Sequence, residues 1–158
     1  MRTINMSQNI QITKAGLDAL NKELDGLVNV KRPKLVERLS YARSQGDLAE
    51  NSDYTYAKED LEFMDGRISE LEEVLKNAKV VLSKGKNGGV AVGTTVTVKI
   101  NGDKSVFEIV GEWEADPVNK KISHESPLGK ALVGKKVGEK AEVEAPAGKV
   151  IYEILEIK

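Results

Sequence analysis

Residues 57–78 read AKEDLEFMDGRISELEEVLKNA, and their apolar side chains recur in alternating steps of four and three. The apolar stripe comprises Ala57, Leu61, Met64, Ile68, Leu71, Leu75 and Ala78. This spacing is typical of a helix that packs along its length against another helix, as in a coiled coil. At about 1.5 Å per residue, a helix from about Asn51 to Ala78 would be roughly 40 Å long.

A matching apolar stripe lies upstream, and a short polar break separates the two. The upstream stripe comprises Leu17, Leu20, Leu24, Leu27, Leu35, Leu39 and Ala42. Thr13 suits the N-cap of this helix, and Pro33 within it is expected to bend the helix rather than end it. Because the break at residues 44–46 (SQG) is short, we expect the two helices to run antiparallel as a long hairpin.

The second half of the chain has the two-residue period of β-strands. Apolar and polar residues alternate over 95–100, and Asn101-Gly102 is a strong signal for a tight hairpin turn. The strand that follows this turn is expected to include Val106 to Val110. Further strands are expected in three short segments, near residues 121–123, 141–145 and 150–157.

One short helix and a domain boundary complete the predicted architecture. Ser126 suits the N-cap of this helix, Pro127 its first position and Gly134 its end. The sequence therefore predicts an α+β chain of two domains. Residues 1–78 would form the antiparallel coiled-coil hairpin, and residues 79–158 a small β-sheet domain with one short helix.

Composition limits the classes of function. The chain has 158 residues and a formal net charge of -1, and 31% of its residues are charged. This near-neutral balance argues against strong non-specific binding to nucleic acid. With no cysteine, disulfides and cysteine metal sites are excluded. No apolar run approaches the ~20 residues that cross a bilayer, and the polar N-terminus lacks the apolar core of a signal peptide, so we expect a cytoplasmic protein without a membrane partner.

Two carboxylates mark the break between the helices. At the start of a helix, Asp47 and Glu50 would lie on one face, about one turn apart. Carboxylate oxygens suit Mg2+, but this ion takes about six ligands, so water, phosphate or another protein must supply the rest. Asp47-x-x-Glu50 also fits a capping box, and the spacing alone favours this structural role. The two roles are compatible because each carboxylate has several lone pairs.

Other side chains give weaker signals. Arg43 and Lys58 flank the break and would form a small basic patch able to contact a phosphate, unless they are solvated or paired with Asp53 or Glu59. His124 is the only histidine and cannot anchor an ordinary zinc site, so we expect a structural role. Three aromatic side chains are expected in the core of the sheet: Phe107, Trp113 and Tyr152.

Several motifs resemble one known family. Residues 46–54 (GDLAENSDY), with Ala57-Lys58-Glu59 after them, closely resemble the tip motif of the GreA and GreB transcript elongation factors. Arg32-Pro33, Gly66-Arg67-Ile68 and residues 126–135 (SPLGKALVGK) are also similar to that family. The resemblance covers nearly the whole chain, with the motifs in the same order.

This resemblance implies a fold and a site. The fold would be an antiparallel coiled coil followed by an FKBP-like domain, which docks on bacterial RNA polymerase at the rim of its secondary channel. The coiled coil would carry its tip through that channel to the catalytic centre. Asp47 and Glu50 match the two acids that help to hold a second Mg2+ ion, shared with the polymerase. Arg43 and Lys58 match positions near the basic patch that faces the 3′ end of the nascent RNA.

The function implied is that of a transcript cleavage factor. The chain, expected to be monomeric, would be no enzyme by itself. It would stimulate the polymerase to cleave the 3′ end of backtracked RNA, so that elongation resumes. Three other functions stay open: an inhibitory relative that plugs the channel, a prolyl isomerase suggested only by the implied fold, and a passive coiled-coil adaptor.

Overall fold

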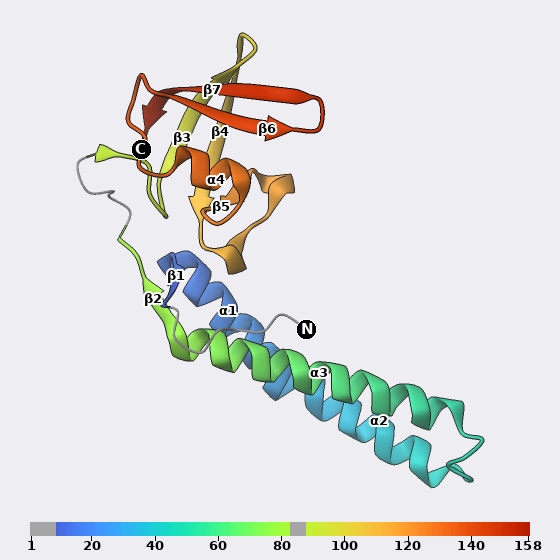
Figure 1. Ribbon diagram of the computed structural model, residues 1–158. Coiled ribbons are helices and arrows are strands. Elements are labelled where there is room, and N and C mark those ends of the chain that lie inside the picture. The colour runs from blue at the N-terminus through green and yellow to red at the C-terminus, as the bar shows by residue number, and fades with distance from the viewer. Residues whose placement is uncertain (1–8, 83–87) are drawn as a thin grey trace. The chain divides into compact units, whose positions relative to one another are not determined.

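The computed structural model describes residues 9–82 and 88–158, which divide into two compact units. One unit is the helical hairpin, Asp18–Asn77. The other joins residues 9–17 with the described part of Ala78–Lys158 and contains the β-sheet. Figure 1 shows the paired helices of the first unit and the sheet of the second.

The hairpin consists of two helical arms. The first arm is α1 (Lys14–Gly26), a π-helical turn (Leu27–Lys31) and α2 (Arg32–Ser44), and the second arm is α3 (Ser52–Asn77). Ion pairs join the arms at three levels: Glu23 with Arg67 at 2.9 Å, Arg32 with Asp65 at 2.7 Å, and Arg38 with Asp53 at 2.5 Å. Residue numbers rise along one arm as they fall along the other, which confirms the predicted antiparallel hairpin.

The apolar seam, more than the ion pairs, stabilises the hairpin. The pairs lie at the surface, where each contributes at most about 1 kcal/mol. The hydrogen bond from Arg32 holds the pKa of Asp65 below its usual range, so this carboxylate stays ionised into mild acid. Fully buried side chains along the seam include Ala42 and Ala57 next to the tip, and Leu71 and Val74 toward the base.

A π-helical turn precedes Pro33. The backbone N–H of Arg32 donates to the carbonyl of Leu27, five residues back instead of four. A proline ring inside an α-helix crowds the carbonyl four residues back and removes one donor. The wider turn lies where that conflict would occur. The arm therefore continues through Pro33, as predicted, while the expected bend stays a prediction.

The second unit is built on a five-stranded sheet. Its strands are β3 (Thr95–Ile100), β4 (Asp103–Val110), β5 (Lys121–Ser123), β6 (Lys140–Ala145) and β7 (Gly148–Ile157), in the order β5-β4-β3-β7-β6. Within this five-stranded sheet, β4–β5 is the parallel pair and the other described pairs are antiparallel. The turn between β3 and β4 has positive φ at both Asn101 (50°) and Gly102 (96°), as the Asn-Gly signal predicted.

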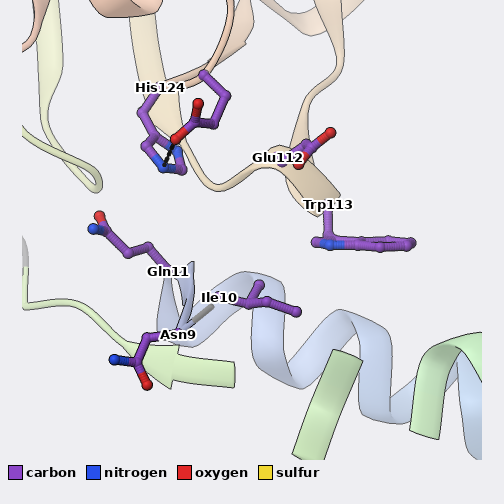
Figure 2. A pocket seen from close by; sticks show the side chains of 7 residues that line it. Asn9, Ile10, Gln11, Glu112, Trp113 and His124 are labelled. Atoms are coloured by element: carbon purple, nitrogen blue, oxygen red, sulfur yellow. Dashed lines mark ion pairs between the residues drawn. The ribbon is translucent and has the colours of Figure 1, made fainter. Parts of the chain in front are cut away.

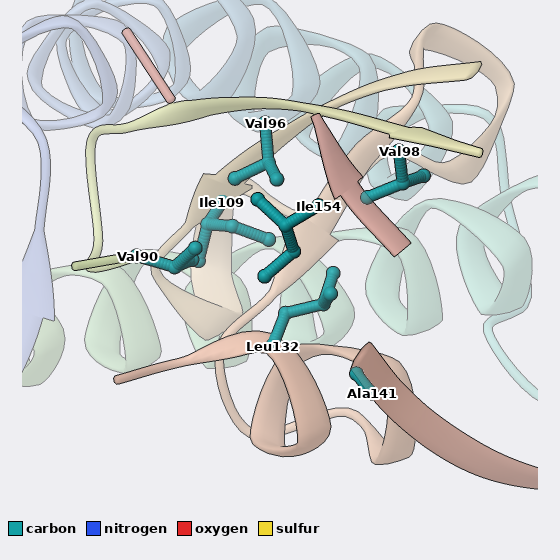
Figure 3. Close-up of a cluster of buried hydrophobic side chains, with 7 residues drawn as sticks. All are labelled: Val90, Val96, Val98, Ile109, Leu132, Ala141 and Ile154. Carbon is teal, nitrogen blue, oxygen red and sulfur yellow. The ribbon is translucent and has the colours of Figure 1, made fainter. Parts of the chain in front are cut away.

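One helix covers this sheet. In α4 (Pro127–Leu132), the Ser126 hydroxyl caps the first turn by accepting the Gly129 N–H at 3.0 Å. Leu132 is fully buried against the strands (Figure 3). The core cluster comprises Val90, Val96, Val98, Ile109, Leu132, Ala141 and Ile154. Phe107 and Tyr152 pack against it, as predicted. Trp113 does not: it lies in a 3-10 turn, η3 (Glu112–Glu114), because the strand ends before it.

Residues 10–16 are held by a carboxylate from the sheet unit. β1 (Ile10–Ile12) pairs in parallel with β2 (Ala78–Val80). Glu114 accepts hydrogen bonds from the backbone N–H and the hydroxyl of Thr13. The same hydroxyl accepts the Gly16 N–H at 3.0 Å, which confirms Thr13 as the N-cap of α1. A Cβ at Gly16 would overlap the Glu114 carboxyl group, so a side chain there would displace this carboxylate from Thr13.

The predicted α+β fold is confirmed, with a long helical hairpin, a small sheet and one short covering helix. The compact units place residues 9–17 with the sheet. The proposed division into domains at residue 79 stays a prediction. Within the described residues, no helix has the length and apolar character needed to span a membrane.

The alanines next to the tip, Ala42 and Ala57, are fully buried in the seam between the arms. We expect Ala57→Leu to destabilise the hairpin by about 1–3 kcal/mol, because Ala57 is fully buried and extra methylenes must displace the facing arm. Loss of helical circular dichroism on heating measures this. Glu59→Leu adds a similar side chain at an exposed position of α3 and should melt like the parent. Equal melting of both variants would show that the seam is loosely packed.

Candidate functional site: the hairpin tip

The tip is the turn between α2 and α3. α2 ends at Ser44 and α3 begins at Ser52, so residues 45–51 form the connection. Gly46 has φ +145°, which disfavours any residue with a side chain. Residues 45–50 are exposed, including Leu48 at 40%.

Asn51 closes the turn with both ends of its amide. The side-chain oxygen accepts the backbone N–H of Tyr54 at 3.1 Å, which makes Asn51 the N-cap of α3. The side-chain NH2 donates to the carbonyl of Ala42 at 2.6 Å, in the last turn of α2. One side chain thus satisfies a free donor of α3 and adds a second bond to the Ala42 carbonyl, which also accepts the Gln45 N–H at 3.2 Å. Sequence reasoning missed this role, although asparagine is among the preferred N-cap residues.

The capping-box interpretation of Asp47 and Glu50 is wrong. The Asp47 carboxylate accepts the backbone N–H of Ala49, two residues later, at 3.0 Å, which forms an Asx turn. The first helical residue is Ser52, so neither carboxylate lies at a helix start. An aspartate could cap α3, but it has no donor for the Ala42 carbonyl. Asn51 makes both bonds, and the helix begins after it.

Asp47 and Glu50 instead line one shallow hollow in the loop. The hollow is bounded by Gln45, Gly46, Asp47, Glu50 and Asn51. Within the described chain, Glu50 makes no hydrogen bond or ion pair, and Asp47 bonds only to the backbone. Their placement on one helical face was wrongly predicted, but the loop still brings both carboxylates to one exposed place. Both are open to a partner.

The tip fits only part of a magnesium site. Oxygen ligands from carboxylates suit Mg2+, which takes about six in all. Across the described residues, no group of three or more acidic or histidine side chains could hold a metal ion. Asp47 and Glu50 can therefore contribute to a shell that another molecule completes. They do not form a complete site of their own.

The two basic residues lie on the two arms beside the tip. Arg43 is in the last turn of α2, is exposed, and has no ion pair among the described residues. Lys58 on α3 makes a long contact of 3.9 Å with Glu62, one turn along its own helix. Neither pairs with Asp53 or Glu59, and Asp53 is held by Arg38. Both cations stay available to an anion.

A second hollow lies in the sheet unit and has different chemistry. Its lining includes Gln11, Trp113 and His124 (Figure 2). One ring nitrogen of His124 lies 3.3 Å from the Val110 carbonyl, and the other lies 3.3 Å from Glu125. These two contacts fit the hydrogen-bonded structural role expected for this histidine.

Both parts of the chain match one family. Residues 10–80 match the family described as "Transcription elongation factor, N-terminal", and residues 85–158 match "Transcription elongation factor, GreA/GreB, C-term". The transcription elongation factor GreA of Caldanaerobacter subterraneus subsp. tengcongensis is 48% identical over 156 residues, or 97% of this chain and 99% of that protein. The protein of the same name from Bacillus subtilis is 45% identical over 148 residues, or 92% and 94%. The GreA factor homolog 1 (Gfh1) of Thermus thermophilus superposes with a TM-score of 0.45 at 25% identity, over 96% of this chain and 99% of that chain.

The two hydrogen bonds of the Asn51 side chain predict a graded loss of stability when this residue is substituted. Asn51→Ala should lower the stability of the hairpin by about 1–2 kcal/mol, because the cap and the bond to Ala42 are both lost. Asn51→Asp keeps the acceptor for the Tyr54 N–H but loses the donor to the Ala42 carbonyl. The stability of this variant should therefore lie between those of Asn51→Ala and the parent. Thermal melts followed by circular dichroism measure the order. Ser52→Ala, at the exposed neighbouring position, should leave the melting temperature unchanged. If Ser52→Ala lowers the melting temperature as much as Asn51→Ala does, the side chain of Asn51 does not close the turn.

Proposed function

The chain belongs to the GreA/GreB family and is a transcription elongation factor, and on this basis we propose that it stimulates transcript cleavage by RNA polymerase. The hairpin enters the secondary channel of the polymerase and brings its tip to the catalytic centre. The sheet unit docks at the rim of that channel. The polymerase then cleaves the 3′ end of backtracked RNA and resumes elongation.

One observation carries this proposal: Asp47 and Glu50 share an exposed hollow at the end of a long hairpin. A carboxylate that is paired within its own protein is costly to transfer to another site. Glu50 makes no such pair, and Asp47 gives only one bond to the backbone. Both can add oxygen ligands to a centre that the polymerase already forms.

The chemistry at that centre belongs to a divalent cation. Asp47 and Glu50 would hold it together with groups of the polymerase. When bound, Mg2+ activates an attacking water and stabilises the leaving oxygen of a phosphodiester. The chain's own task is to position two carboxylates. The turn closed by Asn51 restricts their freedom before binding, which lowers the entropy that binding must remove.

Arg43 and Lys58 would contact the phosphates of the displaced RNA end. Contacts to phosphate position a nucleic acid without reading its sequence. One cation on each arm beside the tip suits that task. Loss of either should weaken the hold on RNA while leaving the two carboxylates in place.

Cleavage of a backtracked transcript tests the proposal directly. We expect Asp47→Ala and Glu50→Ala each to reduce stimulated cleavage at least about a hundredfold, a loss typical of removing a group that acts on the transition state. Binding to the polymerase should stay near that of the parent. The measurement uses a stalled complex with 5′-labelled RNA and Mg2+, in which the shortened RNA must be extendable.

The controls distinguish the alternatives. Glu59→Ala removes an exposed carboxylate of α3 outside the hollow and should cleave like the parent. Binding without cleavage by the parent protein would indicate an inhibitory relative or a passive adaptor. Absence of both binding and cleavage would reject the proposed function.

A further inference from the structure

The hairpin has an apolar groove on one side, away from the tip. Its lining includes Leu27 and Leu35 of the first arm and Met64 of α3. Phe63 also lines it and is 82% exposed, the most exposed aromatic side chain within the described residues. A phenylalanine left in water beside an apolar groove marks a surface that another molecule covers.

Gly66 leaves the surface of α3 one turn after Phe63 without a side chain. It lies in the middle of α3, three residues after Phe63, where glycine costs roughly 1 kcal/mol relative to alanine. A Cβ built there meets nothing within 4 Å among the described atoms, so the hairpin itself does not require a glycine. The missing side chain leaves room for a close approach from outside at this point of the helix.

The unbalanced charge of the groove is positive. Its two arginines are neutralised within the hairpin: Arg38 pairs with Asp53 and Asp60, and Arg67 pairs with Glu23 and Glu70. Lys31 and Lys34 also line the groove, and neither forms an ion pair with a described residue. An occupant with carboxylates opposite these two lysines would complement the groove.

The apolar lining of the groove disfavours a nucleic acid as the occupant. A phosphate backbone would leave Leu27, Leu35, Phe63 and Met64 without an apolar partner. A groove between two helical arms instead matches an amphipathic helix, whose apolar residues recur every three or four positions.

We propose that this groove docks an acidic amphipathic helix of the RNA polymerase, which would pack as a third helix on the hairpin. The proposal rests on the proposed function, because a hairpin inside the polymerase is surrounded by that protein. It adds a contact that is separate from the tip and from the sheet unit. Phe63 would be the central anchor, and Lys31 and Lys34 would set the charge and direction of the bound helix.

Charge reversal on the full chain tests the electrostatic half of the proposal. The double variant Lys31→Glu and Lys34→Glu should weaken binding to the stalled polymerase complex at least about tenfold, as loss of a central contact does. The matched control is Lys22→Glu with Lys76→Glu, which makes the same change of charge at exposed positions of the hairpin outside the groove. Equal affinity of the two double variants would overturn the proposal. All four positions are exposed, and melting curves verify that each variant is folded.

Photocrosslinking identifies the occupant. Phe63→p-benzoylphenylalanine should crosslink to a helical, acid-rich segment of the polymerase, whereas the same residue at the exposed position Glu72 should not. Crosslinks from position 63 to RNA, to a second copy of this chain, or to nothing would overturn the proposal. If crosslinks and binding behave as expected but no cleavage is stimulated, the proposed function fails and the groove assignment stands. If the parent binds no polymerase, both fail.

Discussion

The geometry of the tip depends on the two hydrogen bonds of one amide. Asn51 caps the first turn of α3 and holds the last turn of α2, so the ends of both helices are fixed by the same side chain. A helix end leaves several backbone groups without partners, and two facing ends leave both donors and acceptors. The asparagine amide offers a donor and an acceptor on two different atoms. A carboxylate can only accept, and a serine hydroxyl uses one oxygen for both roles. The loop that carries Asp47 and Glu50 is therefore closed at its base and open at its surface.

Much of the fold could be predicted from local patterns. The alternating three and four steps predicted both arms, and Asn101-Gly102 predicted the turn between β3 and β4, because each pattern reflects a short-range geometric requirement. The pairing of β1 with β2 could not be predicted, since it joins residues 68 positions apart through backbone bonds that no side chain specifies. The same holds for Glu114, which reaches Thr13 across 101 positions.

The local structure around Asp47 and Glu50 was predicted wrongly, while their role stays a prediction. Asp47 and Glu50 have the spacing of a capping box, and Asn51 a few residues on is an equally good cap. Spacing alone does not decide between them. The decision depends on a tertiary contact: the Asn51 amide also donates to the Ala42 carbonyl, which a carboxylate cannot do. Trp113 was misplaced for a related reason: the strand pattern of β4 ends at Val110, and the turn after it has no periodic signal.

The π-helical turn before Pro33 sets the angular phase of the whole outer part of the hairpin. A turn of this kind holds one more residue than an α-helical turn, and one residue of an α-helix corresponds to about 100° of rotation. The apolar stripe of this arm steps from Leu27 to Leu35, which is eight residues, one more than the seven that steps of four and three would give. The wider turn takes up that extra residue, so the apolar positions after Pro33 return to the seam, where Ala42 is buried. The π-helical turn is thus the place where the first arm accommodates a one-residue mismatch between its sequence and the helix that it packs against.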